Sequence, residues 1–309
     1  MEDLRDRVVA EVSKVVIGLD DVITKILAAL LLGGHVLLEG PPGVAKTLLA
    51  NATARAVGLP FRRLQFTPDM LPSDVTGTMT LRAGDLTFRP GPVFTNVLLA
   101  DEINRTPPKT QAALLEAMQE ARVTIEGEPH ALPDPFLVVA TQNPIEYEGT
   151  YPLPEAQLDR FLMKLDIAYP DADEERRILL LRHRGVAPAT LDDVQPVLDM
   201  AALKQARYEV DSTGVSDEVV DYVTAIVRAT RDLPAIELGA SPRAGVHMLA
   251  AARAQARLDA RGFVTPDDVA AVAHDVLRHR LILRPEAELE RYRTDDAVTT
   301  VLEAVPVPR

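Results

Sequence analysis

A glycine-rich run followed at once by a lysine and a threonine carries the residue types that hold a phosphate chain. Backbone N–H groups of such a loop, and the N-terminus of the helix after it, attract phosphate oxygens. The lysine would reach the β- and γ-phosphates of a nucleotide, and the threonine hydroxyl would bind Mg²⁺. We predict that the nucleotide-binding residues are Gly40, Pro41, Pro42, Gly43, Val44, Ala45, Lys46, Thr47 and Leu48.

One position of this loop departs from the strict pattern, which has glycine where Ala45 stands. If the loop needs a left-handed backbone there, alanine costs roughly 1 kcal/mol relative to glycine. The alternative interpretation of the run is a glycine-rich turn before a surface helix. An apolar, strand-like stretch before the loop and a helical stretch after it favour the phosphate site.

Two adjacent acids, Asp101 and Glu102, follow an apolar run downstream of the loop. A strand over residues 97–100 would deliver the Asp101 carboxylate to Mg²⁺ beside Thr47. The Glu102 carboxylate could then orient and polarise a water aimed at the γ-phosphate. Two acids at a strand end are usually just solvated, but downstream of a phosphate-binding loop they favour hydrolysis.

Three polar residues further along could complete this chemistry. Asn143, in a Thr-Gln-Asn-Pro run, could help to hold the attacking water if its strand neighbours that of Asp101. Arg160 ends a short helical run, from which it could reach the γ-phosphate of a neighbouring subunit. Arg243 lies in the first turn of a helix, where the helix dipole disfavours a cation unless a phosphate is bound. The alternatives are an Asn-Pro turn, a surface pair of Arg160 with Asp159, and an exposed Arg243.

The elements that position these residues are short apolar runs alternating with helical segments. That alternation predicts a mainly parallel sheet covered by helices. Two helices precede the first strand, the second after a cap at Asp20. Residues 78–88 and 122–132 have the pattern of hairpins inserted into this layer. The predicted strands are residues 35–38, 63–66, 97–100, 136–140 and 161–167.

Strand patterns fade after Pro170, and the remaining sequence has the punctuation of helices. Asp171 with Glu174 forms a capping pair, and a hydroxyl residue precedes proline at 241–242 and 265–266. Gly262 is expected to end the helix between those two starts. We therefore predict two domains, an α/β core over residues 1–170 and a helical lid over residues 171–309.

Composition excludes several kinds of chemistry and partner. The chain has no cysteine, which excludes disulfides, cysteine-ligated zinc and thiol catalysis, and its six histidines lack metal-ligand spacing. A formal charge of −13 disfavours nonspecific binding to nucleic acid. Met1-Glu2-Asp3 does not resemble a signal peptide, and the longest apolar run, residues 26–32, is too short to span a membrane. We expect a cytoplasmic protein.

Together these motifs resemble the AAA+ ATPases and, within them, the MoxR family. The segments 101–105, 140–144, 152–161 and 239–243 are similar to its Walker B, sensor 1, arginine-finger and sensor 2 segments. Alanine at position 45 is common in that family. The resemblance covers nearly the whole chain and implies a five-stranded αβα core with a helical lid. It also implies a hexameric ring that hydrolyses ATP, with Mg²⁺, between its subunits.

The resemblance implies further roles for single residues. Arg105 resembles an additional intersubunit arginine, and Val16, Ile17 and Gly18 resemble the adenine-contacting segment. The two hairpins resemble the family's insertions in its second helix and before sensor 1. We expect Arg160 to act on a neighbouring subunit and Arg243 to act from the lid of its own chain.

Three functions are compatible with this ATP site. The resemblance implies chaperone-like remodelling or maturation of other proteins, including metal-cofactor insertion, with partners that carry von Willebrand factor A domains. The alternatives are the motor subunit of a metal chelatase and a nucleic-acid motor. The acidic charge disfavours the nucleic-acid motor, and the hairpins offer little positive charge. Residues 69–77 lack the aromatic residue of threading unfoldases, which favours a local conformational push.

Overall fold

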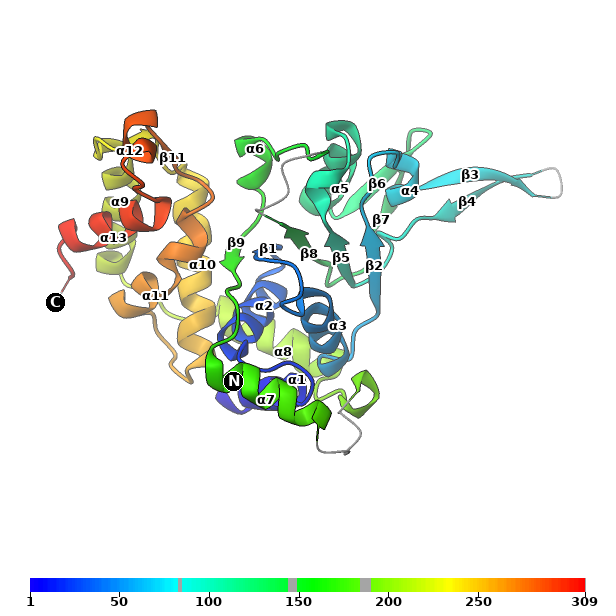
Figure 1. Cartoon of the computed structure of the whole chain (residues 1–309), viewed down its shortest axis with the longest axis horizontal. Helices are drawn as coiled ribbons and strands as arrows, with labels where there is room; N and C mark the ends of the chain where they lie inside the picture. The colour runs from blue at the N-terminus through cyan, green and yellow to red at the C-terminus, as the bar shows by residue number, and fades with distance from the viewer. Residues whose placement is uncertain (83–84, 144–148, 184–189, 309) are drawn as a thin grey trace.

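The computed structural model of the protein describes residues 1–82, 85–143, 149–183 and 190–308 (Figure 1). Its central strands are β1 (Val36–Glu39), β2 (Phe61–Gln65), β5 (Val97–Asp101), β8 (Leu137–Gln142) and β9 (Met163–Asp166). They form one sheet in the order β2-β5-β8-β1-β9, and every neighbouring pair is parallel. The predicted α/β class and all five predicted strands are confirmed.

Successive side chains of a strand point to opposite faces of the sheet. Because the side chains on both faces are apolar here, helices cover both faces. Val36 and Leu38 of β1 belong to one hydrophobic cluster, and Leu37 between them belongs to the other. All three side chains are fully buried, so both faces of β1 are covered. In the first cluster the strands pack with α1 (Glu2–Val12), α2 (Asp20–Leu32) and α3 (Lys46–Ala56), among others. In the second cluster they pack with α5 (Pro108–Glu120).

Both predicted hairpins are present as two-stranded antiparallel sheets. The first extends away from the body of the molecule (Figure 1), and residues 83–84 between its strands lie outside the described part of the chain. Phe88 stacks on His130 with ring centroids 4.1 Å apart, which joins the two hairpins. Their strands are β3 (Gly77–Arg82) with β4 (Asp85–Pro90), and β6 (Arg122–Ile125) with β7 (Glu128–Ala131).

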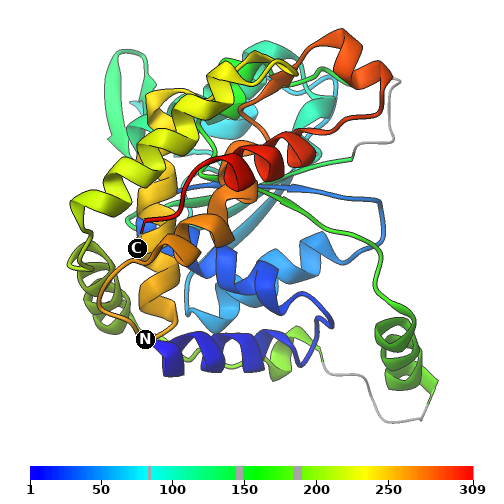
Figure 2. The ribbon, with the colours of Figure 1, turned by 90° about the vertical axis from the view of Figure 1, so that its left-hand side faces the viewer.

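Most of the helices after the sheet pack against the core, whereas the first of them, residues 172–183, lies apart from the yellow-to-red helices in Figure 2. Buried residues of the last helices belong to the same hydrophobic cluster as α1, α2 and α3. The Val197 N–H also donates to Ala56 O at 2.8 Å, which fixes the segment before α8 to the core. The expected division at residue 170 stays a prediction. These helices are α7 (Ala172–His183), α8 (Met200–Asp211), α9 (Asp217–Asp232), α10 (Pro242–Leu258), α11 (Pro266–Leu277), α12 (Pro285–Leu289) and α13 (Thr294–Ala304).

The starts of two helices test the capping signals. Asp171 and Glu174 exchange the predicted hydrogen bonds at the start of α7, at 2.8 and 3.0 Å. The cap expected at Asp20 is wrong, since Leu19 is the N-cap of α2 and Asp20 is already helical. The Asp20 carboxylate instead accepts a hydrogen bond from Ser13 Oγ at 2.8 Å, in the turn after α1.

The end of α10 also differs from the expectation. The helix begins at Pro242 as predicted, but it ends at Leu258 rather than at Gly262. Ala260, with φ 60°, makes the left-handed turn, and sequence punctuation gave no sign of it because glycine is the usual residue there. Two short strands that were not predicted, Ile236–Leu238 and Ile282–Leu283, pair in this region. No helix in the described ranges is both long and apolar enough to cross a membrane.

Candidate active site

The phosphate-binding loop begins where β1 ends and leads directly into α3. A Cβ atom at Gly40 would lie 2.4 Å from Ile167 O, so the close approach of the two segments requires glycine there. Lys46 opens α3, and its Nζ donates to Gly40 O and to Pro41 O, the latter at 3.2 Å. The loop therefore lies at the carboxyl edge of a parallel sheet, where ligands of such folds bind, and beside the positive end of a helix dipole.

Ala45 adopts the left-handed conformation, with φ 61° and ψ 23°. The strict pattern has glycine at this position because the backbone needs that conformation, and alanine meets the need at roughly 1 kcal/mol. The loop of this chain therefore keeps the geometry of the strict pattern despite the departure in sequence.

Asp101 ends β5 next to the loop, and both of its carboxylate oxygens have partners. Oδ1 accepts from Thr141 Oγ1 at 2.6 Å, and Oδ2 accepts from Arg63 Nε at 2.9 Å. Thr47 Oγ1 lies 3.4 Å from the same Oδ2. A hydroxyl and a single carboxylate fit Mg²⁺, which takes few protein oxygens and completes its shell with phosphates and waters. The described residues contain no cluster of three His, Cys, Asp or Glu side chains that could hold a metal by themselves.

Glu102 is held in an unusual backbone conformation beside Asp101. Its φ of 56° is left-handed, and its N–H donates to Thr141 Oγ1 at 2.9 Å. Its Oε2 accepts from Gln65 Nε2 at 2.7 Å and pairs with Arg105 Nε at 3.0 Å. Strain of this kind in a non-glycine residue is typical of functional sites, where surrounding contacts stabilise it.

Asn143 directly follows β8, and it is 9% exposed. β8 lies between β5 and β1 in the sheet, so Asn143 reaches the same edge as Asp101 and the phosphate loop. The condition set for Asn143, that its strand neighbours that of Asp101, is therefore met. Pro144, which completes the motif, lies outside the described residues.

Three residues of this site were missed from the sequence: Arg63 and Gln65 of β2, and Thr141 of β8. Each is a polar residue on a strand next to β5, and a polar residue near a strand end was the only available signal. The strand order decides which of these polar residues belong to the site, because only the strands beside β5 can contact the two acids.

The segment expected to contact adenine lies between α1 and α2. Val16, Ile17 and Gly18 line a cavity of about 250 Å³ together with Glu174 and Arg177 of α7. A Cβ atom at Gly18 would lie 2.2 Å from Glu174 Oε1, so α7 closes tightly on this segment. The adenine assignment stays a prediction, and the sequence gave no sign of the two α7 residues.

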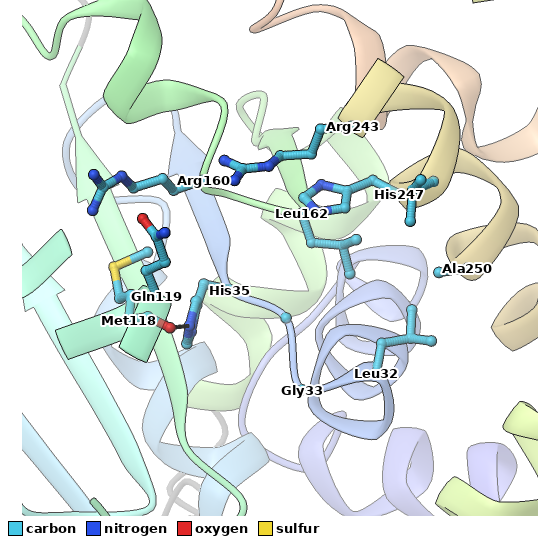
Figure 3. Close-up of a pocket in the computed structure, with 12 residues that line it drawn as sticks. Leu32, Gly33, His35, Met118, Gln119, Arg160, Leu162, Arg243, His247 and Ala250 are labelled. Atoms are coloured by element: carbon cyan, nitrogen blue, oxygen red, sulfur yellow. Dashed lines mark hydrogen bonds between the residues drawn. The ribbon is translucent and has the colours of Figure 1, made fainter. Parts of the chain in front are cut away.

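Arg160 and Arg243 lie at the opposite edge of the sheet from the phosphate loop. Arg160 precedes β9, which runs parallel to β1 with Met163 beside Val36, so Arg160 is at the amino ends of these strands. Arg160 Nη1 donates to Leu115 O at 2.8 Å. Both arginines line a cavity of about 370 Å³, and the turn before β1 lines the same cavity (Figure 3).

This placement corrects the expectation about Arg243 and rules out the alternative given for Arg160. Arg243 cannot serve its own phosphate loop in this arrangement, because the length of β1, about 13 Å for four residues, separates its cavity from that loop. The reason is that the lid packs beside the amino edge of the sheet. Arg160 does not pair with Asp159, whose Oδ1 accepts from Arg280 Nε at 2.7 Å.

The buried histidine of this cavity is structural. His35 Nδ1 accepts from the Val138 N–H at 3.0 Å, and Nε2 faces Met118 O at 3.0 Å. Burial lowers the pKa of His35 to about 4, so the ring is neutral near pH 7 and carries its proton on Nε2.

Comparison with known proteins decides the family. Residues 35–163 match the ATPase family associated with various cellular activities (AAA), and residues 228–301 match the AAA lid domain. Chaperone MoxR1 of Mycobacterium tuberculosis is 45% identical to this chain over 98% of its length and 82% of the relative's. The chain is a MoxR-family AAA+ ATPase.

Further similarities extend over the full length of this MoxR-family ATPase. The uncharacterised protein YeaC of Bacillus subtilis is 47% identical over 100% of the chain and 96% of its own length. The crystal structure of a candidate ATPase from Cytophaga hutchinsonii is 41% identical, with a TM-score of 0.91 over 100% of this chain and 96% of that one. The protein is therefore a nucleotide-binding enzyme that hydrolyses ATP.

Proposed function

We propose that this MoxR-family ATPase works as a ring in which each ATP site is shared by two subunits. One subunit contributes the phosphate loop, Asp101, Glu102 and Asn143. The next contributes Arg160 and Arg243. The observation that carries the proposal is that the two arginines and the phosphate loop lie at opposite edges of the same sheet.

In this site the residues of the first subunit bind the nucleotide and prepare the water. Lys46 and the N-terminus of α3 hold the phosphates. Thr47 and Asp101 would hold Mg²⁺, which would supply charge neutralisation at the phosphate oxygens. Glu102 polarises the attacking water, and Asn143 helps to orient it. Arg160 and Arg243 of the neighbour add positive charge where the transition state develops negative charge.

We further propose that the ring is a hexamer and that it remodels or matures a partner protein. The name of the relative Chaperone MoxR1 supports a chaperone-like role. The β3–β4 hairpin supplies a surface for it, since Leu81 and Leu86 face each other across the strands and are 71% and 69% exposed. A partner with a von Willebrand factor A domain and metal-cofactor activation of the client rest on the family resemblance alone. A cytoplasmic location rests on the sequence expectation alone.

The shared site is tested with mixed rings. Lys46→Ala should abolish ATP binding in calorimetry, and Arg160→Ala should bind ATP but lose about 10³-fold or more in turnover. Mixing the two chains creates interfaces with an intact loop and an intact arginine, so ATPase activity should recover. Arg122→Ala, at an exposed arginine of the second hairpin, is the control and should leave activity unchanged.

A second mixture tests whether Arg243 acts on the neighbour. Suppose that Arg160 and Arg243 enter the same neighbouring site. In a mixture of Arg160→Ala and Arg243→Ala chains, every chain then presents only one of the two arginines to its neighbour, so the mixed rings stay inactive. If Arg243 served its own chain, that mixture would recover activity. No recovery with Lys46→Ala and Arg160→Ala, in rings shown to be mixed, would refute the shared site.

A further inference from the structure

One buried arginine ties the lid to the segment that carries Arg160. Arg280 follows α11, and its side chain is 1% exposed. Its Nε donates to Asp159 Oδ1 at 2.7 Å, and its Nη2 donates to Phe161 O at 2.5 Å. Its Nη1 lies 3.4 Å from Leu162 O. A single guanidinium therefore donates hydrogen bonds to the residues on both sides of Arg160.

Asp159 carries the connection on to Arg243. While Oδ1 accepts from Arg280, Oδ2 lies 3.7 Å from Arg243 Nη1 and 3.5 Å from Ser241 Oγ. Ser241 is the N-cap of α10 and Arg243 lies in its first turn. One carboxylate thus links the end of α11, the start of α10 and the residue next to Arg160.

His247 supports the same arginine from α10. It lies one helical turn after Arg243, and its Nδ1 accepts from Arg280 Nη2 at 2.6 Å. Burial and the charge of Arg280 lower the pKa of His247 to about 4, so the ring is neutral near pH 7 and can accept this bond. Figure 3 shows His247 and Arg243 on the same side of the cavity.

The chemistry of arginine explains why this group stands here. Its planar fork donates several hydrogen bonds in fixed directions, whereas lysine is a point charge on a flexible stem. A buried cation is also tolerated only when it is paired and hydrogen-bonded. Moving one of its partners away is therefore costly, because it leaves the buried charge unpaired. Arg160 and Arg243 are therefore attached to one rigid polar cluster, defined by Asp159, His247 and Arg280.

We propose that Arg280 and Asp159 are positioning residues that hold Arg160 and Arg243 at a fixed separation, so that both enter the neighbouring subunit's ATP site together. This inference rests on the proposed shared site. It adds that the lid and the segment before β9 move as one body, and that neither arginine works when the cluster is disturbed.

The test uses full-length Arg280→Lys, which keeps the buried charge beside Asp159 but loses the fork. Because misplacement by about 1 Å can cost 10²-fold, we expect homogeneous rings to lose about 10²-fold in ATPase turnover. Affinity for a non-hydrolysable ATP analogue should stay within about twofold, since the variant's own phosphate loop is untouched. Mixing it with Lys46→Ala chains, which present an intact cluster, should restore activity.

The direction of this recovery separates positioning from general damage. Damage that spreads to the variant's own nucleotide site would persist in mixed rings, because an intact neighbour supplies arginines but no phosphate loop. Arg261→Lys is the matched control, since Arg261 pairs with Asp268 within the lid and should keep wild-type turnover. Wild-type turnover in Arg280→Lys, or no rescue by Lys46→Ala, overturns the inference.

Two safeguards keep the result interpretable. If Arg280→Lys does not fold, Asp159→Asn tests the same link from the other side with the same expected rescue. The mixture of Arg160→Ala with Lys46→Ala is run in parallel. Failure of that mixture refutes the shared site, whereas its recovery without rescue of the cluster variants refutes only the positioning role.

Discussion

The hydroxyl of Thr141 should be needed for both stability and hydrolysis. It donates to Asp101 Oδ1 at 2.6 Å and accepts from the Glu102 N–H at 2.9 Å, and the residue is 1% exposed. Thr141→Val keeps the shape and deletes both bonds. Losing a hydrogen bond to a carboxylate costs about 1.5–3 kcal/mol, and a buried unpaired N–H adds about 1 kcal/mol. We expect the free energy of unfolding to fall by about 3 kcal/mol.

The effect on turnover follows from the backbone of Glu102. The bond from its N–H to Thr141 is one of the contacts that hold its left-handed conformation, and therefore the direction of its carboxylate. Thr141→Val should lower the turnover number about tenfold or more, because small misplacements of a catalytic group are costly. ATP affinity should change little, since Thr141 is not part of the phosphate loop.

Thr53→Val is the matched control for this prediction. Thr53 of α3 is also buried, but its Oγ1 has no hydrogen-bond partner within the described residues. The same substitution there should change the free energy of unfolding by less than about 1 kcal/mol. Denaturant unfolding, turnover at saturating ATP and calorimetric ATP affinity are measured for both variants. Equal losses in the two, or wild-type behaviour of Thr141→Val, would refute the reasoning.

Three further outcomes are expected. Glu102→Gln should keep ATP affinity but lose about 10²-fold or more in turnover, and hydrolysis at the wild-type rate would assign the water to another residue. Ala45→Gly should relieve the left-handed strain and, after the entropy cost of glycine, raise the free energy of unfolding by up to about 1 kcal/mol, which a lowered denaturation midpoint would contradict. Burial lowers the pKa of His35 to about 4, and burial with the charge of Arg280 lowers the pKa of His247 to about 4. The unfolded chain therefore takes up protons below about pH 6.5 that the folded chain does not. The free energy of unfolding should fall by roughly 2 kcal/mol per histidine from pH 7 to pH 5. A free energy of unfolding that stays constant over this range would contradict the prediction.

Local patterns predicted much of the nucleotide site. The glycine loop, Lys46 and Thr47 are contiguous in sequence, and the acids at Asp101 and Glu102 directly follow a buried strand, so their spacing fixes their local geometry. The same holds for the strands themselves, whose continuous apolar runs reflect burial on both faces. The predicted start of α2 and the predicted end of α10 were wrong because more than one neighbouring residue could make the same turn.

The sequence by itself determined that this chain binds and hydrolyses ATP, because those motifs are short and their chemistry depends on near neighbours. Only the tertiary structure decided that Arg63, Gln65 and Thr141 contact the two acids, since that depends on which strands lie beside β5. The place of Arg243 was likewise decided by how the lid packs on the core. Hydrophobic packing carries no direction that a sequence pattern records, and it brought Arg243 to Arg160 rather than to its own phosphate loop.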